Sequence, residues 1–495
     1  MLIKSQMLTK RTKSCTITKN KERETEMAKK EIENEAKQLK EKLFMHKKNA
    51  YLRMSDSDIK KCDKFCEGYK RFLDEAKTER EAAGYIEREA KAAGFVKFDK
   101  KKKYKAGDKV YLINREKSAI LAVIGSEPIE NGVNLLAAHI DSPRLDMKQN
   151  PLMEKDEVGY FKSHYYGGIK KYQWTTVPMS LHGVIVKADG SKVIVKIGED
   201  ENDPVFCVSD LLPHLASAQM KRPAPELIKG EELNLIIGSR PFKDDEVSEK
   251  VKLNLMALLN KKYGITEADF LSAELEAVPA FKARDIGFDR SLVGAYGQDD
   301  RVCAYTELSA ILEAKNLKKT AVAILTDKEE TGSDGNTGLQ SAYLKYFIAD
   351  LAAIFGARAR DVLSNSKCLS ADVNAAFDPT FADAFEKNNS CVLNGGVCVT
   401  KYTGSRGKSG TSDASAEFVG EVRAILDKKG VIWQTGELGK VDIGGGGTVA
   451  KYIANLNVDT IDVGVPVMSM HAPYEITAKT DVYAAYKAFE AFINA

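Results

Sequence analysis

The stretch Asn134-Leu-Leu-Ala-Ala-His139-Ile-Asp141-Ser-Pro143 decides the fold, because an apolar run ends there on a histidine and an aspartate. The apolar residues before His139 predict a buried strand. Open α/β sheets hold ligands outside the carboxyl ends of their strands, so polar residues at this position favour an α/β fold with a site there. Asp141 can accept a hydrogen bond from the His139 ring nitrogen that faces away from a metal. A packed structural histidine explains the same pattern equally well.

On both sides of this stretch, strand-like runs alternate with helical periodicity. This alternation predicts an α/β fold in which helices cover a mixed sheet. Strands are predicted over 109–114, 119–124, 133–138, 320–326, 367–372 and 460–465, and helices over 303–316, 335–355, 411–429 and 478–494.

The segment from 149 to 284 has a different pattern. Alternating residues in 183–187 and 192–197 predict antiparallel strands, and several prolines mark loops between them. We therefore expect one α/β domain, formed by residues 27–148 and 285–495, that is interrupted by a β-rich domain at residues 149–284.

The amino-terminal 26 residues account for the net positive charge of the chain. They hold seven basic and three acidic residues, and since the whole chain carries +3, the remainder carries −1. The body therefore lacks the electrostatic footprint of a nucleic-acid-binding protein. We expect residues 1–26 to be a disordered leader and translation to start at Met27, where an amphipathic helical pattern begins. Detection of peptides from residues 1–26 in natively expressed protein would contradict this start.

Targeting and membrane signals are weak throughout the chain. The leader has neither the apolar core of a secretory signal nor the composition of a transit peptide, and no apolar run reaches the roughly 18 residues that cross a bilayer. The eight cysteines form no paired CxxC motifs. Reduced thiols in a cytoplasmic protein are therefore favoured over a disulfide framework or a thiol catalyst.

Four further polar clusters follow predicted strands or begin a helix. In Gln298-Asp299-Asp300, either aspartate could simply cap the helix. In Asp327-Lys-Glu329-Glu330-Thr-Gly332, two adjacent glutamates follow a buried strand, so that one can bind a metal while its neighbour stays free as a base. Carboxylate and imidazole groups without thiolates suit a two-metal hydrolytic centre, in which a bridging water attacks a carbonyl. The clusters are Gln298-Asp299-Asp300, Asp327-Lys-Glu329-Glu330-Thr-Gly332, Ser370-Ala-Asp372 and Met468-Ser-Met-His471.

Taken in order with His139-Ile-Asp141, these clusters resemble the motifs of the aspartyl aminopeptidase family of dinuclear zinc metallopeptidases. The resemblance covers essentially Met27 to Ala495. It implies a zinc aminopeptidase/phosphorylase-like fold and an aminopeptidase that acts on peptides with a free amino terminus. It further implies that the inserted domain forms dimers, which the family assembles into tetrahedral dodecamers.

The resemblance also assigns metal ligands, with one residue bridging two divalent ions that are Zn²⁺, or alternatively Co²⁺ or Mn²⁺. It places His139 and Asp372 on one metal, Glu330 and His471 on the other, and Asp299 between them. Three other residues receive roles through the resemblance. Glu329 becomes the general base that takes a proton from the bridging water, and Asp141 orients His139. His214, in Leu-Pro213-His214-Leu, becomes a donor to the oxyanion in the neighbouring subunit.

One segment departs from the family pattern. Members that prefer acidic amino-terminal residues carry a lysine in a segment matching 401–413, where this chain has altered length and spacing. Neutral or basic amino-terminal residues therefore stay open beside Asp and Glu. A related metal-dependent deacylase or carboxypeptidase, and an inert assembly protein on the same scaffold, are the alternative functions.

Overall fold

The computed structural model describes residues 27, 29, 33–45, 47–244 and 246–495. The predicted leader and His46 therefore lie outside the described residues. The chain divides into two units after Lys48. In the first unit, residues 33–43 are helical. Residues 49–495 form the second unit, which contains all the predicted site residues.

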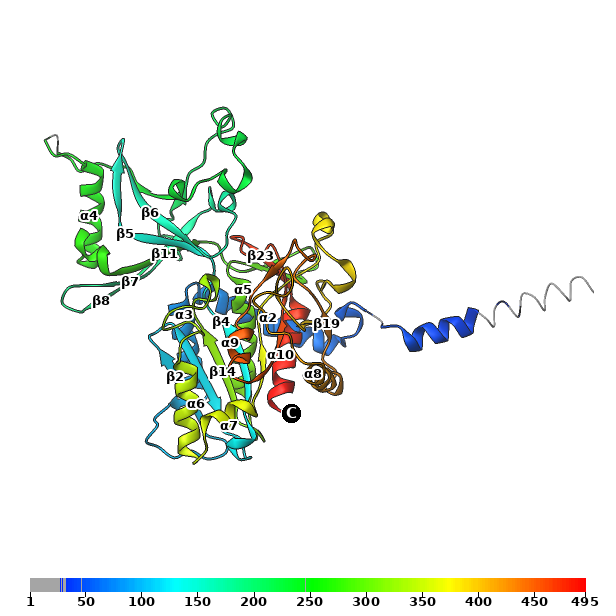
Figure 1. Ribbon diagram of the computed structural model, residues 1–495. Helices are drawn as coiled ribbons and strands as arrows, with labels where there is room; N and C mark the ends of the chain where they lie inside the picture. The colour runs from blue at the N-terminus through cyan, green and yellow to red at the C-terminus, as the bar shows by residue number, and fades with distance from the viewer. Residues whose placement is uncertain (1–26, 28, 30–32, 46, 245) are drawn as a thin grey trace, which may run out of the picture. The chain divides into compact units, whose positions relative to one another are not determined.

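A nine-stranded mixed sheet is the centre of the second unit (Figure 1). At its middle, β14, β4 and β15 are parallel neighbours, with Thr326 opposite His139 and Ser370 opposite Ala137. Parallel neighbours end at the same edge of the sheet, so the residues that follow them are brought together. In spatial order the strands are β1 (Val96–Lys97), β2 (Lys109–Asn114), β3 (Ser118–Val123), β14 (Ala321–Thr326), β4 (Asn134–His139), β15 (Lys367–Ser370), β21 (Asp459–Gly464), β17 (Val397–Thr400) and β19 (Trp433–Thr435).

Helices cover both faces of this sheet, which confirms the predicted fold class. Successive side chains of a strand point to opposite faces, and in β4 Leu136 and Ala138 belong to one buried core while Leu135 and Ala137 belong to the other. The first core is closed by α2 (Asp56–Glu75), α3 (Glu79–Ala92), α5 (Gln298–Glu313), α8 (Ala416–Lys428) and α10 (Lys479–Ile493), and the second by α6 (Tyr343–Ile354), α7 (Ala359–Ser364) and α9 (Ala450–Ala454).

A seven-stranded sheet, packed with α4 (Lys250–Tyr263), holds a third core around the fully buried Trp174. In spatial order its strands are β8 (Lys192–Ile197), β7 (Met179–Val186), β11 (Ala273–Pro279), β5 (Arg144–Lys155), β6 (Val158–Tyr166), β10 (Asn234–Gly238) and β9 (Cys207–Val208). A five-stranded sheet runs β12 (Arg284–Ile286), β13 (Leu292–Ala295), β23 (Glu475–Ala478), β22 (Pro466–Met468) and β16 (Asn374–Ala375), and β18 (Gly404–Ser405) pairs with β20 (Gly445–Gly446).

Buried charges join the seven-stranded sheet to the start of α3. Lys77 is only 2% exposed, and its Nζ lies 2.7 Å from Glu199. His182 of β7 lies between two carboxylates, with Nδ1 2.9 Å from Glu81 and Nε2 3.1 Å from Glu199. A buried charge is tolerated when it is paired and hydrogen-bonded. These pairs therefore link two parts of the chain that are far apart in sequence.

The helix predicted over 335–355 is shorter in the structure. Residues 335–342 form turns and α6 begins at Tyr343. The Thr337 hydroxyl donates to Asp327, at 2.6 Å, and a Cβ on Gly338 would lie 2.3 Å from the Ser333 carbonyl oxygen. These tertiary contacts hold the segment against the loop that follows β14. The helix predicted from 411 likewise begins later, because Ser415 caps it by accepting from the Phe418 N–H.

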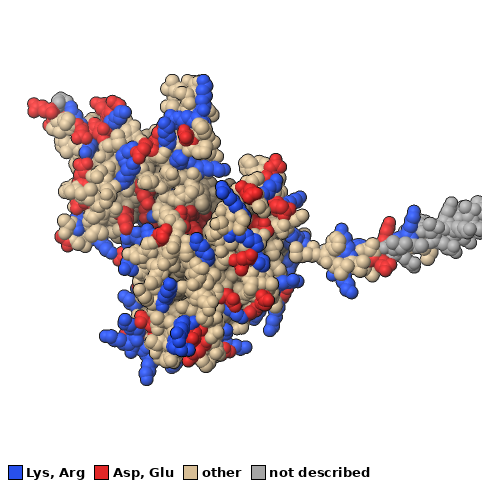
Figure 2. Space-filling model, viewed as in Figure 1, with Lys and Arg blue, Asp and Glu red and all other residues tan. Residues whose placement is uncertain are grey.

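Two further features are the start of α2 and the charge on the surface. Ser55 is the N-cap of α2 and accepts from the Asp58 N–H. On the face in Figure 2, Lys and Arg alternate with Asp and Glu. Within the described ranges, no helix combines the length and the apolar character that a membrane crossing needs.

Candidate metal centre

Three parallel neighbouring strands deliver four of the predicted site residues to one edge of the nine-stranded sheet. His139 is the last residue of β4, and Asp372 lies two residues beyond β15. Glu329 and Glu330 occupy η8 (Glu329–Thr331), a short 3-10 helix that follows β14. The strands were predicted from their apolar runs, and their parallel pairing explains why these distant residues meet.

Asp299 joins this group from the first turn of α5, and His471 joins it from the loop after β22. The two oxygens of Asp299 face different histidines: Oδ1 lies 3.2 Å from His139 Nε2, and Oδ2 lies 3.1 Å from His471 Nε2. Glu330 Oε2 lies 3.5 Å from the same nitrogen of His471, and Asp372 Oδ1 lies 3.9 Å from His139 Nε2. All five predicted ligands are therefore gathered around a central carboxylate.

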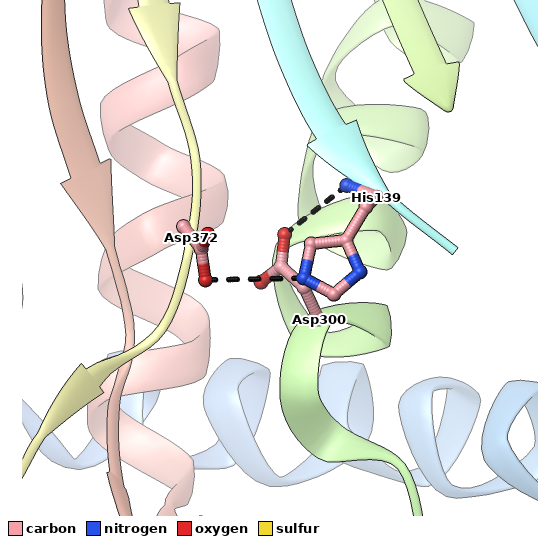
Figure 3. A group of neighbouring side chains, drawn as sticks. All are labelled: His139, Asp300 and Asp372. Carbon is pink, nitrogen blue, oxygen red and sulfur yellow. Dashed lines mark hydrogen bonds and ion pairs between the residues drawn. The ribbon is translucent and has the colours of Figure 1, made fainter. Parts of the chain in front are cut away.

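Asp300 is a further acidic residue at the centre. Figure 3 shows its carboxylate beside the His139 ring and opposite Asp372. One oxygen accepts from the His139 N–H at 3.4 Å, and Asp300 can group with His139 and Asp372 around an ion. The sequence suggested only a possible helix cap for Asp300, whereas Gly297 is the N-cap of α5. The only sequence signal that could have identified Asp300 as part of the site is its position directly after Asp299.

The donor set fits divalent cations. Ligand atoms of His139, Asp299 and Glu330 lie within 4.8 Å of one another. Asp300 Oδ1 and Glu330 Oε1 are buried and have no hydrogen-bond partner in the described part of the chain. Leaving a buried charged oxygen unpaired is costly, and a cation would satisfy these atoms. Nitrogen and oxygen ligands without cysteine are typical of catalytic rather than closed structural zinc sites.

Burial and neighbouring charged groups together shift the pKa values of Glu329 and Asp299. Burial raises the pKa of Glu329 to about 7, with further increases from the charges of Asp141 and Asp299. For Asp299, burial acts in the same upward direction, but hydrogen bonds from His139 and His471 outweigh it and hold its pKa below the usual range. Glu329 belongs to neither group of potential ligands. A half-buried carboxyl with a pKa near 7 is suited to accepting a proton near neutral pH.

Asp141 is a fully buried acceptor behind the predicted metal ligands. Its carboxylate lies 3.3 Å from His139 Nδ1, and its main-chain carbonyl oxygen is at 3.1 Å from the same nitrogen. It also accepts from the backbone N–H groups of Glu329, at 3.1 Å, and Glu330, at 3.2 Å. The structure therefore places the Asp141 carboxylate beside His139 Nδ1 and adds two backbone contacts that the sequence did not reveal.

Glu475 performs a similar function on the other side of the centre. Its two oxygens accept from the N–H of His471, at 2.8 Å, and from the N–H of Asp299, at 3.0 Å. Glu475 is 1% exposed. Because β23 carries it beside α5, only the tertiary structure reveals this contact.

In the described part of the chain, neither His214 nor the segment 401–413 makes a hydrogen bond or an ion pair with this centre. His214 is exposed and makes no hydrogen bond or ion pair with the five ligands within the described chain. In the segment 401–413, Lys401 and Lys408 both pair with Asp413. Its strand β18 pairs with the glycine-rich run at β20.

A cavity of about 650 Å³ opens beside the Glu330 side chain. Its other walls come from β5, from the end of β6 and from η8, and they combine aromatic, charged and polar groups. They are Asp146, Met147, Lys148, Gln149, His164, Tyr165, Tyr166, Gly167 and Thr331.

Comparisons with known proteins agree on one family. A family model described as aminopeptidase I zinc metalloprotease (M18) matches residues 72–493. A probable M18 family aminopeptidase 1 of Clostridium acetobutylicum is 51% identical over 460 residues, covering 91% of this chain and 99% of the relative. The crystal structure of an M18 aminopeptidase from Thermotoga maritima matches with a TM-score of 0.87 and 43% identity, covering 91% of this chain and 100% of that chain. A more distant S. cerevisiae structure, described as an mApe1 dodecamer, shares the fold with a TM-score of 0.70 at 19% identity, covering 86% and 95% of the two chains.

Proposed function

Because the chain belongs to the aminopeptidase I zinc metalloprotease (M18) family and is a metallo-aminopeptidase, we propose that it removes single amino-terminal residues from peptides with Glu329 as the general base. One observation carries the proposal: the imidazoles of His139 and His471 and the carboxylates of Glu330 and Asp372 gather around Asp299, while Glu329 stays outside the ligand groups.

The metal ligands are assigned from their neighbours. His139 and Asp372 would hold one divalent ion and Glu330 and His471 the other, with Asp299 between the two. When bound, the two ions would polarise the scissile carbonyl and acidify the attacking water. Zinc is the metal implied by the family, and cobalt or manganese could replace it.

Glu329 moves the proton in this proposal. Its carboxylate accepts a proton from the attacking water and then gives that proton to the leaving amine nitrogen. Both transfers use the same group, so a pKa near neutrality is favourable. The Asp141 carboxylate holds the Glu329 backbone and the His139 ring in place.

The substrate occupies the cavity beside Glu330. Its volume of about 650 Å³ and its mixed polar and aromatic walls suit a peptide chain rather than a single residue. The cations of Lys401 and Lys408 are already paired with Asp413. We therefore assign no preference for acidic amino-terminal residues.

The assembled enzyme is a homo-oligomer in this proposal. Residues 149–284 would form dimers, and twelve subunits would form a tetrahedral shell, as the family resemblance implies; the S. cerevisiae mApe1 structure of the same fold is described as a dodecamer. His214 would then donate to the oxyanion of the neighbouring subunit's reaction. The seven described cysteines are free thiols, and the cytoplasmic localisation expected from them stays a prediction.

Hydrolysis of a panel of aminoacyl fluorogenic substrates tests the proposed activity. Chelation should abolish hydrolysis, and zinc, cobalt or manganese should restore it. Peptides with a free amino group should be cleaved, whereas amino-acetylated peptides should not. Cleavage of the acetylated peptides would instead favour a deacylase or carboxypeptidase, and no metal-dependent activity on any substrate would favour an inert assembly protein.

A further inference from the structure

The segment Tyr166-Gly167-Gly168 brings the seven-stranded sheet against the candidate metal centre. Tyr166 is the last residue of β6, and the two glycines follow it directly. The segment contacts both sides of the centre, although no motif in the sequence marked it. We call it the Tyr-Gly-Gly clasp.

The Tyr166 hydroxyl supports one side of the centre. It donates to Asp141 Oδ2 at 2.8 Å, while the other oxygen of Asp141 faces His139 Nδ1 at 3.3 Å. The Tyr166 ring is held in turn by Arg144, whose guanidinium lies 3.9 Å from the ring centroid. Arg144 is 6% exposed. The hydroxyl is therefore aimed at Asp141 by a buried cation–π contact.

The Gly168 carbonyl supports the other side. Its oxygen lies 2.7 Å from His471 Nδ1, so this nitrogen carries the hydrogen and donates it. The ring nitrogen left for a metal is Nε2, which faces Asp299 and Glu330. A hydrogen bond of this kind fixes the tautomer and ring orientation of a histidine ligand.

Gly167 allows the clasp to approach this closely. Its φ of +77° lies in the left-handed region, and a Cβ there would lie 3.1 Å from Glu330 Oε2. A side chain at Gly167 would therefore both strain the backbone and press on a predicted metal ligand.

We propose that Tyr166 and Gly168 are positioning residues. Tyr166 orients the imidazole of His139 through Asp141, and Gly168 orients the imidazole of His471 directly. The seven-stranded sheet thereby completes both metal sites. This inference rests on the proposed metal ligands. It adds that metal affinity depends on residues of a sheet that supplies no ligand.

Cobalt binding to the full-length protein tests the clasp. The metal-free wild type, Tyr166→Phe, Gly167→Ala and Tyr165→Phe are titrated with Co²⁺ against a competing chelator, and the visible cobalt spectrum is recorded. Phe keeps the ring over Arg144 and removes only the hydroxyl, and the exposed neighbour Tyr165 provides the matched control. Loss of such outer contacts typically weakens metal binding about 10–100-fold. We expect that loss, with an altered spectrum, for Tyr166→Phe and Gly167→Ala but not for Tyr165→Phe.

The outcomes separate the clasp from the proposed function. Turnover of Tyr166→Phe should recover towards the wild-type value at saturating Co²⁺, which a folding defect would not allow. Wild-type cobalt affinity and spectrum in both Tyr166→Phe and Gly167→Ala would overturn the clasp while leaving the metallo-aminopeptidase proposal intact. A wild-type protein that binds no Co²⁺ would overturn both.

Discussion

Asp299 is the residue on which the centre depends. Its oxygens face His139 and His471 at nearly equal distances, and its backbone N–H is held by Glu475. Burial of an isolated carboxylate would favour its protonated form, yet the two imidazoles keep the pKa of Asp299 low. Asp299 therefore stays ionised at neutral pH, which its proposed role as a bridging ligand requires.

Glu329→Gln provides the test of the general base. Gln keeps the shape of the side chain but accepts no proton, so we expect turnover to fall about 10²–10⁴-fold, the usual contribution of general acid–base catalysis. Bound metal, measured by elemental analysis, should remain at the wild-type level because Glu329 is outside the ligand groups. The exposed Glu201→Gln is the control and should keep full activity. Undiminished hydrolysis by Glu329→Gln would reject the mechanism.

Among the elements, β4, β14 and β15 place the ligands, because parallel neighbours end at one edge of the sheet. The antiparallel strand β7 supplies no proposed ligand. Instead, His182 on β7 connects this strand to α3 through buried ion pairs. These contacts bring the two sheets together without involving the metal ligands.

His182 makes the stability of this junction depend on pH. Burial would lower its pKa, but hydrogen bonds to Glu199 and Glu81 outweigh burial and raise it above the ordinary 6.5. The other charged groups that face this cluster are Lys77, Lys196 and Lys282, each paired with one of the same two glutamates. Because folded His182 keeps its proton to higher pH than the unfolded chain does, its stabilisation is complete below pH 6.5 and is lost as pH rises through the raised value.

His182→Gln should therefore destabilise the protein more at pH 6 than at pH 9. We expect a loss of about 1.5–3 kcal/mol at pH 6, the range for hydrogen bonds to charged groups, and a smaller loss at pH 9. Urea unfolding of metal-free protein at both pH values measures it. The same change at the exposed His164 should have little effect at either pH, and an equal loss for His182→Gln at both would contradict the assignment.

At the scale of the whole molecule, three sheets contribute residues to one site. The nine-stranded sheet and the five-stranded sheet carry the ligands, while the seven-stranded sheet contributes the cavity walls and the Tyr-Gly-Gly clasp. In the proposed assembly His214 adds a contribution from another subunit. The exposed position of His214 leaves it available for such a contact.

Mixing two inactive variants tests the contribution between subunits. His214→Phe should lower turnover about 10²–10³-fold, as loss of one oxyanion donor typically does, with metal content unchanged. When His214→Phe and Glu329→Gln subunits are dissociated and reassembled together, part of the activity should return, because some sites combine an intact Glu329 with an intact neighbouring His214. A mixture that stays inactive would place His214 in its own subunit's site or outside catalysis.

Much of the fold was predictable from local pattern. The apolar runs at 119–124 and 320–326 are strands in the structure to within a residue, because buried strands need uninterrupted apolar side chains. The turns at 335–342 were not predictable, since Thr337 and Gly338 are held there by contacts with the loop after β14. The local periodicity of the sequence contains no information about such tertiary contacts.

The same division holds for the candidate site. By itself the sequence determined the strands that lead to His139, Glu329 and Asp372, and the order of motifs that identifies the family. Only the tertiary structure decided that Asp300 and Glu475 lie against the proposed ligands, that Tyr166 contacts Asp141 and that Gly168 contacts His471. The reason is physical: a ligand type and its strand end are local properties of the chain, whereas the contacts that orient a ligand are made by whichever element packs behind it.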